Sequence, residues 1–539
     1  MKKTLFTFFI LIGFTVSAQT EDAWVYFTDK QNVATALANP ITILTQAAID
    51  RKNLHGTPID ARDVPVNQSY ISQIKSATDI TVFAKSKWFN CVYVRGSQAA
   101  INALANLAFV DSIDFANSSL NSREAESVKI NFYQKVNKKL EVATDFTYGN
   151  TANQVEMLNV DYLHQQNYTG EGITIAVMDA GFPNVNTLAA FQRMRNNGDL
   201  LDGYDFVDDV DDEFLFTGSS HGTSVLSTIT GFVQNDFVGT APDASVYLFR
   251  TEDVWSETPV EMAYWVEAAE RADSLGVFVI NTSLGYSMFD NLSYSFSPSD
   301  MDGETAFISR GATVAFEKGM LVVNSAGNEG NGSWGIVTAP ADSPGALAIG
   351  AVDANGNYAS FSSTGPSADG RVKPDVAAQG ASAAVITASG NISNASGTSF
   401  SSPIMAGAIA SLWQADPSKT NLEIMQIVRQ SASQFNNPDI FLGYGIPDFQ
   451  AALANFSTEE ITEENSFSIY PNPVSEKLYV DFSKENASAN LQIYSILGRK
   501  VMEQQNVTDF ITVSSLAPGM YLVKIVSEEK VATFKIVKK

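Results

Sequence analysis

ITIAVMDAGF, from Ile173 to Phe182, is the stretch that most narrows the choice of fold. Its first half is almost wholly apolar, so both faces of an extended strand would be buried, as in the parallel sheets of α/β proteins. Asp179 closes this run, and a charge at the end of a buried strand needs a partner. Sites in open parallel sheets form at the carboxyl ends of strands, so Asp179 is either a site residue or a turn or capping aspartate.

Further apolar runs of strand length follow, with helical patterns between some of them. The helical patterns cover residues 259–276 and 304–319. Buried strands that alternate with helices predict a parallel sheet with helices on both faces, extending over residues 148–456. The further strand-like runs are Val246–Phe249, Val277–Ile280, Leu321–Val323 and Leu347–Ile349.

The flanking regions have different patterns of apolar and polar residues. Residues 19–120 predict a small α+β unit, and residues 121–147 form a polar linker. An acidic linker at 457–466 leads into residues 467–539, whose alternating apolar and polar residues predict a small antiparallel β-sandwich. Residues 1–18 carry two lysines and then an apolar run, which indicates a signal peptide; the run is shorter than the ~20 residues of a membrane span.

The composition excludes some classes of partner. The 539-residue chain has a net charge of −25, which makes nucleic acid and anionic membranes poor partners. Its single cysteine, Cys91, permits no internal disulfide. An exported chain of this kind must be stable through the size of its core or through bound cations.

The stretch NASGTSFSSPIMAG, residues 394–407, predicts the start of a buried helix. Proline is tolerated in the first turn of a helix, so Pro403 is expected there, with Ser399 at the N-terminus. Backbone N–H groups and the helix dipole favour negative charge at that end. Gly397 leaves room for the backbone to approach closely.

Two other polar residues have a comparable setting. His221, one of three histidines, starts a helical pattern in GSSHGTSVLSTITG, residues 218–231. Asn328 lies in a turn after the apolar run of MLVVNSAGNEGNGS, residues 320–333, and could donate to a developing negative charge. Taken singly, His221 could equally be a structural histidine, and Asn328 could equally be a turn asparagine. Together with Asp179 and Ser399 they supply a nucleophile, a base, an orienting carboxylate and an oxyanion donor.

These residues occur within motifs that resemble those of the subtilisin-like serine proteases. The motifs, in chain order, are VMDAGF, SHGTSV, NTSLG, SAGNEG, KPDVAAQG and SGTSFSSP. The resemblance covers about residues 148–456 and implies that Asp179 orients His221, that His221 is the base, that Ser399 is the nucleophile and that Asn328 is the oxyanion donor. It also implies substrate binding, by a P1 pocket and an added strand, at Ser283, Leu284, Gly285, Ser325, Ala326 and Gly327.

Two residues depart from the family pattern. The family usually has Ser or Thr after the aspartate, where this chain has Ala180, and often a second histidine where it has Ser224. The loss of a hydroxyl beside Asp179 predicts reduced rather than abolished activity.

The resemblance extends to both flanking units. The N-terminal unit resembles the propeptide of secreted subtilases, which assists folding and inhibits the enzyme until it is cut off; a retained domain is the alternative. The C-terminal unit resembles the sorting domain of the type IX secretion system of Bacteroidetes; a carbohydrate- or protein-binding sandwich is the alternative. Cys91 would leave with a cleaved propeptide.

An acidic run lies between Asp179 and His221. Such clusters can bind calcium, although this spacing matches no EF-hand, and a solvated acidic loop is the favoured interpretation. The run comprises Asp202, Asp205, Asp208, Asp209, Asp211, Asp212 and Glu213.

The sequence therefore predicts a secreted or cell-surface serine endopeptidase, exported through the periplasm, with protein or peptide substrates. It needs no cofactor or catalytic metal, although structural calcium remains open. Its other partners are its own propeptide and the secretion machinery. The alternative is a catalytically silent binding protein on the same fold; an esterase is disfavoured because it would show Gly-x-Ser-x-Gly and the order Ser, Asp, His.

Overall fold

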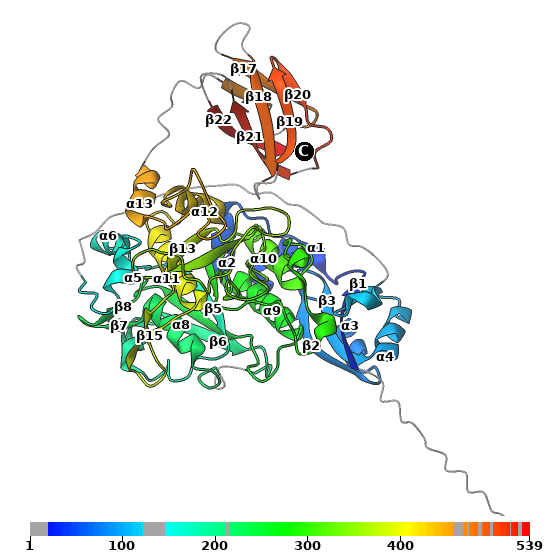
Figure 1. Ribbon diagram of the computed structural model, residues 1–539. Coiled ribbons are helices and arrows are strands. Elements are labelled where there is room, and N and C mark those ends of the chain that lie inside the picture. Colours follow the sequence, from blue (N-terminus) through cyan, green and yellow to red (C-terminus); the bar gives the residue numbers. More distant parts are fainter. Residues whose placement is uncertain are drawn as a thin grey trace, which may run out of the picture.

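The computed structural model describes residues 20–121, 146–210, 215–457, 467–471, 474–482, 488–495, 500–517, 519–526 and 531–539. Along the chain they form an N-terminal α+β unit, a central α/β domain and a C-terminal unit of two sheets (Figure 1). The predicted signal peptide and nearly all of the linkers 121–147 and 457–466 lie outside the described residues. Among the described residues, no helix combines the length and apolar character that a bilayer span requires.

The central domain is built on a seven-stranded parallel sheet with the order β13-β12-β11-β10-β5-β9-β6. In β5, Ile175 and Val177 join the apolar cluster on one face, and Ala176 and Met178 join the cluster on the other. This burial on both faces confirms the parallel sheet that the sequence predicts. The strands are β5 (Thr174–Asp179), β6 (Leu200–Asp205), β9 (Ser245–Arg250), β10 (Val279–Thr282), β11 (Leu321–Ser325), β12 (Ala346–Val352) and β13 (Val376–Gln379).

Helices cover both faces of this sheet (Figure 1). Helices α8 and α11 pack against the face of Ile175 and Val177, and α9 and α10 pack against the opposite face. The helices of the domain are α5 (Ala152–Glu156), α6 (Val160–Gln165), α7 (Gln192–Asn197), α8 (His221–Thr230), α9 (Val260–Leu275), α10 (Phe307–Glu317), α11 (Thr398–Gln414), α12 (Asn421–Gln430) and α13 (Phe449–Ser457). Two short ribbons, β7 (Phe232–Val233) with β8 (Phe237–Val238) and β14 (Ala383–Ile386) with β15 (Ile392–Ala395), complete it.

Helix α11 is buried along almost its whole length, as predicted, but it begins earlier than expected. It starts at Thr398, which places Pro403 in its second turn rather than its first. Proline has no N–H, so the carbonyl of Ser399, four residues earlier, loses its usual helix partner. The hydroxyl of Ser283 donates to that carbonyl instead, at 2.9 Å. The proline therefore frees one acceptor for a contact with another strand end.

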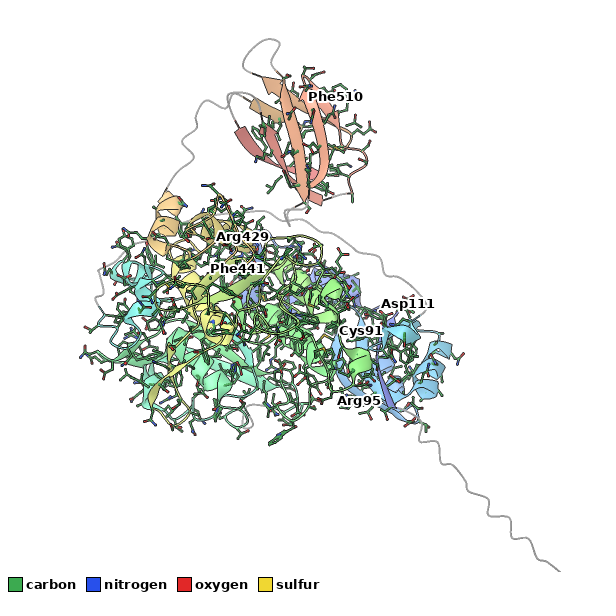
Figure 2. All side chains as sticks on the ribbon, in the orientation of Figure 1. Cys91, Arg95, Asp111, Arg429, Phe441 and Phe510 are labelled. Atoms are coloured by element: carbon green, nitrogen blue, oxygen red, sulfur yellow. The ribbon has the colours of Figure 1, made fainter. Side chains whose placement is uncertain are left out.

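The N-terminal unit is an antiparallel sheet with the order β2-β3-β1-β4 and short helices. It lies against α9 and α10, where the rings of Trp24 and Phe307 are 4.9 Å apart. Cys91 is buried in β3 (Figure 2), and burial raises the pKa of its thiol well above the usual value. The elements are β1 (Thr20–Phe27), α1 (Val33–Ala38), α2 (Gln46–His55), α3 (Gln68–Lys75), β2 (Ile80–Ser86), β3 (Cys91–Ser97), α4 (Gln98–Ala103) and β4 (Val110–Phe115).

The C-terminal unit is the predicted antiparallel sandwich. Two sheets, β16-β17-β20 and β19-β18-β21-β22, share one apolar cluster that includes Leu478, Ile493 and Val523. The strands are β16 (Phe467–Tyr470), β17 (Lys477–Phe482), β18 (Ala489–Ser495), β19 (Lys500–Val507), β20 (Phe510–Thr512), β21 (Gly519–Val526) and β22 (Val531–Lys538).

Candidate active site

Three neighbouring strands bring candidate residues to one edge of the central sheet. Strand β5 ends at Asp179, β10 runs into Ser283–Gly285, and β11 runs through Ser325 towards Asn328. These strands are parallel and adjacent, in the order β11-β10-β5, so their carboxyl ends lie side by side. The sheet therefore gathers segments that are far apart in the sequence at one edge.

His221 is held by Asp179. The Nδ1 atom of the His221 ring lies 2.9 Å from each carboxylate oxygen of Asp179, which is fully buried. The Asp179 charge raises the pKa of His221 above its usual value of 6.5. A Cβ atom on Gly222 would lie 2.4 Å from the carbonyl oxygen of Gly181 and 2.9 Å from the Cβ of Asp179, so glycine is needed where α8 meets β5.

The other two histidines have structural partners. The ring of His164 contacts the hydroxyl of Tyr148 at 2.9 Å and the carbonyl of Thr240 at 3.1 Å. The ring of His55 contacts the carbonyl of Pro417 at 2.9 Å. Burial lowers the pKa of both to about 4, so neither is poised to exchange protons near neutral pH.

Ser399 and Ser283 hold each other by two hydrogen bonds. The Ser399 hydroxyl donates to the carbonyl of Ser283 at 3.3 Å, and the Ser283 hydroxyl donates to the carbonyl of Ser399 at 2.9 Å. In the described part of the chain no hydrogen bond joins the Ser399 hydroxyl to the His221 ring, although the ring of the next residue, Phe400, lies 5.9 Å from the imidazole. Catalytic hydrogen bonds often form fully only when substrate binds.

The Asn328 side chain has a defined orientation. Its Oδ1 atom accepts from the backbone N–H of Thr398 at 2.9 Å and from the Thr398 hydroxyl at 3.0 Å, which leaves the amide N–H groups free to donate. Gly397 has φ +154°, and a Cβ there would lie 3.8 Å from Asn328 Nδ2 and 3.7 Å from the Ser399 nitrogen. The Asn328 side-chain amide and the backbone N–H of Ser399 therefore both border the space beside Gly397.

The two predicted substrate-binding segments are neighbours. The carbonyl of Leu284 accepts from the Ser325 hydroxyl and from the Asn324 amide, both at 3.3 Å. Ser325 and Ala326 are buried, whereas Gly285 is exposed. Ser283, Leu284 and Gly285 line a pocket of about 560 Å³ together with His221, while Ser325, Ala326 and Gly327 lie on the β11 side of them.

The same pocket contains four acidic residues that are not among the predicted site residues. Glu252, Asp253, Glu257 and Asp290 line it. They follow β9 or lie in the loop after β10, where no periodic pattern marks them. One signal was available, because no lysine or arginine occurs between Arg250 and Arg271.

The acidic run of residues 202–213 is engaged by protein groups where it is described. Arg250 Nη1 lies 2.7 Å from a carboxylate oxygen of Asp205 and of Asp208. Asp202 pairs with Arg271 at 3.5 Å, and Tyr204 donates to Asp209 at 2.8 Å. Each of these four carboxylates therefore has at least one oxygen in contact with a protein group. Asp211, Asp212 and Glu213 lie outside the described residues.

Comparison with known proteins identifies the central domain. Residues 170–445 match the subtilase family. The chain belongs to this family. Residues 22–131 of this subtilase match the peptidase S8 propeptide domain of Bacteroidota, and residues 468–539 match the secretion system C-terminal sorting domain. The subtilase is therefore organised as a zymogen with a type IX sorting domain, as the motifs predict.

Individual relatives agree with the family assignment. The subtilase is 30% identical to subtilisin E of Bacillus subtilis (strain 168) over 318 residues, which are 58% of this chain and 72% of that protein. It is 30% identical to subtilisin Savinase of Lederbergia lenta over 293 residues, 54% of this chain and 93% of that protein. Among solved structures, MycP1 with its propeptide removed gives 25% identity and a TM-score of 0.45, covering 58% of this chain and 98% of that one. This subtilase is a serine-type endopeptidase.

Proposed function

We propose that this subtilase cleaves peptide bonds through a covalent acyl-enzyme on Ser399, with Asp179, His221 and Ser399 as its triad. The observation that carries the proposal is the contact between His221 Nδ1 and buried Asp179, at 2.9 Å. This contact fixes the imidazole tautomer, so that Nε2 is the nitrogen free to take a proton. The raised pKa of His221 matches a base that becomes protonated during catalysis.

In the proposed reaction each of these groups has one role. His221 takes the hydroxyl proton as Ser399 attacks the scissile carbonyl, and the proton then passes to the leaving amine. The side-chain amide of Asn328 and the backbone N–H of Ser399 donate to the tetrahedral oxyanion. The substrate backbone lies as an added strand along Ser283–Gly285 and Ser325–Gly327, and its P1 side chain enters between these segments.

The flanking units fit a precursor that is exported before it becomes active. The signal peptide would direct the chain to the periplasm, and the C-terminal unit would pass it to the secretion machinery and so to the surface or medium. The N-terminal unit would act as a temporary inhibitor until cleavage within residues 121–147. The mature enzyme would then contain no cysteine, because Cys91 is the single one in the chain.

Replacement of the nucleophile tests this proposal. In Ser399→Ala, kcat should fall by about 10⁶-fold, and the uncut precursor should accumulate because self-cleavage is lost. A fluorophosphonate probe should label the wild type and not the variant. Ser401→Ala is the matched control, because its buried hydroxyl donates to Thr398 within the same helix. Peptidase activity that survives in Ser399→Ala, or an unlabelled wild type, would contradict the triad and favour a silent binding protein.

A further inference from the structure

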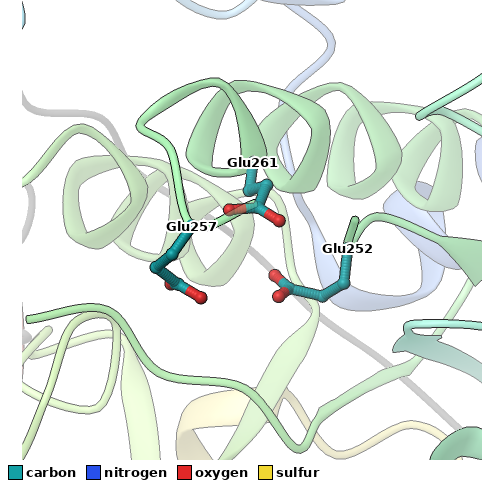
Figure 3. Close-up of side chains that lie close together, drawn as sticks. All are labelled: Glu252, Glu257 and Glu261. Carbon is teal, nitrogen blue, oxygen red and sulfur yellow. The ribbon is translucent and has the colours of Figure 1, made fainter. Parts of the chain in front are cut away.

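The pocket beside His221 has one strongly acidic wall. Glu252, Asp253 and Glu257 follow β9, and Asp290 lies in the loop after β10. Glu261, in the first turn of α9, lies behind them. Figure 3 shows the carboxylates of Glu252, Glu257 and Glu261 directed towards a common space, and oxygens of these three lie within 4.8 Å of one another.

Two of these carboxylates have structural partners. Glu261 accepts from the backbone N–H groups of Asp253 and Thr258, both at 2.9 Å, at the end of α9 where negative charge is favourable. Glu252 accepts from the hydroxyl of buried Tyr286. These contacts hold the wall in place without adding any positive charge.

Glu257 has a fixed backbone and an unused carboxylate. Its N–H donates to the carboxylate of Asp290 at 3.1 Å, and the N–H of Asp290 donates to the Glu257 carbonyl at 3.0 Å. No group of the described chain donates to the Glu257 carboxylate itself, and no described lysine or arginine pairs with any of the five acidic residues. The described protein therefore supplies no cationic side chain to balance these carboxylates when they ionise.

Because no cation balances them, ionisation of all three glutamates at once is unfavourable. Burial, and then the charge of Asp290, raise the pKa of Glu257 to about 7. Burial above all raises the pKa of Glu261 to about 8 and that of Glu252 well above its usual value. A cation in the pocket would stabilise all three carboxylates at once.

We propose that this pocket binds an arginine or lysine side chain of the substrate, at P2 or P4 on the acyl side of the scissile bond. The inference rests on the proposed function, which lays the substrate strand along Ser283–Gly285. P1 enters between that segment and Ser325–Gly327, and alternate side chains of an extended strand point to opposite sides. P2 and P4 therefore point away from the P1 pocket, and the acidic wall lines the same pocket as Ser283–Gly285.

The form of the pocket suits a side chain better than a metal ion. Calcium takes six to eight oxygen ligands, but both carboxylate oxygens of Glu261 already accept backbone N–H groups. The pocket has a volume of about 560 Å³ and includes the His221 ring, so it is continuous with the reacting centre. Trp255, 89% exposed, also lines it and offers an apolar surface to the aliphatic part of a basic side chain.

Matched peptides test the inference on the self-processed enzyme. Two pairs of fluorogenic peptides would differ only in having arginine or uncharged norleucine at P2, or at P4. The wild type should cleave the arginine peptide of at least one pair with a kcat/KM about tenfold higher, because hydrogen bonds to charged groups are strong. Glu257→Gln, which keeps the shape, should reduce this preference to about threefold or less. Glu304→Gln removes an exposed carboxylate outside the pocket and should keep the full preference.

Each outcome gives a decision. An enzyme that cleaves both members of each pair equally, or a preference that persists in Glu257→Gln, overturns the inference and leaves the proposed function intact. The inference is also overturned if calcium raises the melting temperature of the wild type but not of Glu257→Gln and arginine is not preferred. If no peptide is cleaved and Ser399 is not labelled by fluorophosphonate, the proposed function fails and the inference fails with it.

Discussion

Helix α9 carries carboxylates at both of its ends, in opposite electrostatic surroundings. Near its C-terminus, fully buried Asp273 accepts from Arg51 and Lys52 of the N-terminal unit, both at 2.7 Å. These cations lower the pKa of Asp273, and their effect outweighs its burial. At its N-terminus, Glu261 and its neighbours Glu252 and Glu257 have no cationic partner in the described chain, and their pKa values are raised.

The carboxylate of Asp273 is used within the protein, whereas the carboxylates at the other end of α9 are available to a ligand. At the C-terminal end, the partners of Asp273 belong to the unit that is predicted to be cut off, so the pairing marks where the N-terminal unit binds. At the N-terminal end the carboxylates face a pocket shared with His221. A buried carboxylate is costly without a partner, so each unbalanced one suggests a ligand outside the described chain.

Among the charged groups compared, the largest effect is expected at Asp179, whose carboxylate contacts the imidazole of His221, the proposed base. Asp179→Asn should lower kcat by about 10⁴-fold, because an amide stabilises the wrong imidazole tautomer. Asp205→Asn is the control, since it breaks a buried pair with Arg250 without contacting the imidazole. Steady-state kinetics on one peptide measures both, and a loss below about tenfold in Asp179→Asn would mean that its pairing with His221 is only structural.

The next test compares the two ends of α9 directly in the uncut Ser399→Ala precursor. Asp273→Asn should lower the free energy of unfolding by about 3–5 kcal/mol, because it leaves buried Arg51 without its ion-pair partner and buried Lys52 with Asp63 alone, at 3.4 Å. Glu257→Gln should change it by less than about 0.5 kcal/mol, because nothing in the described chain depends on that carboxylate. Denaturant unfolding measures both variants, and equal effects would remove the distinction between the two ends.

The smallest effect is a pH dependence of the arginine preference. With a pKa of about 7, Glu257 is neutral below that pH and charged above it. The ratio of kcat/KM for arginine over norleucine should rise several-fold from about pH 6 to about pH 8. Titration of His221 affects both peptides equally and cancels in this ratio, although it should make each kcat/KM fall as the pH drops through its raised pKa.

The same ratio in Glu257→Gln is the control and should rise clearly less than in the wild type across this range. The other charged groups around Glu257 are Glu252, Asp253, Glu261, Asp290 and His221, and they remain in the variant. A ratio that rises equally in both enzymes would assign the titration to one of them instead.

Much of the fold and of the candidate site could be predicted from local patterns. Apolar strand-length runs identified the strands around Asp179, and the motifs around His221 and Ser399 supplied the order Asp, His, Ser. The start of α11 was placed too late, because the loss of a helix bond at Pro403 is offset by a hydroxyl from a distant strand end. No local pattern could show that replacement.

The acidic residues also show that a local sequence pattern cannot report contacts between distant residues. Two acidic stretches lie in the central domain, and the sequence pattern allows calcium at residues 202–213. In the structure Arg250 pairs with Asp205 and Asp208 and Arg271 pairs with Asp202, whereas no cationic side chain of the described chain pairs with Glu252 or Glu257. Which acidic group is balanced depends on where the arginines lie in space, and spacing along the chain does not report it.

The amino-acid sequence by itself determined the parallel sheet, the buried helix that carries Ser399 and the residue types of the site, because strand burial and helix periodicity are properties of short stretches. Tertiary structure alone decided which side chains meet: His221 with Asp179, Ser399 with Ser283, and three glutamates with one another. Hydrogen bonds and charge interactions act over a few ångströms, and only the folded chain brings residues so distant in sequence within that range.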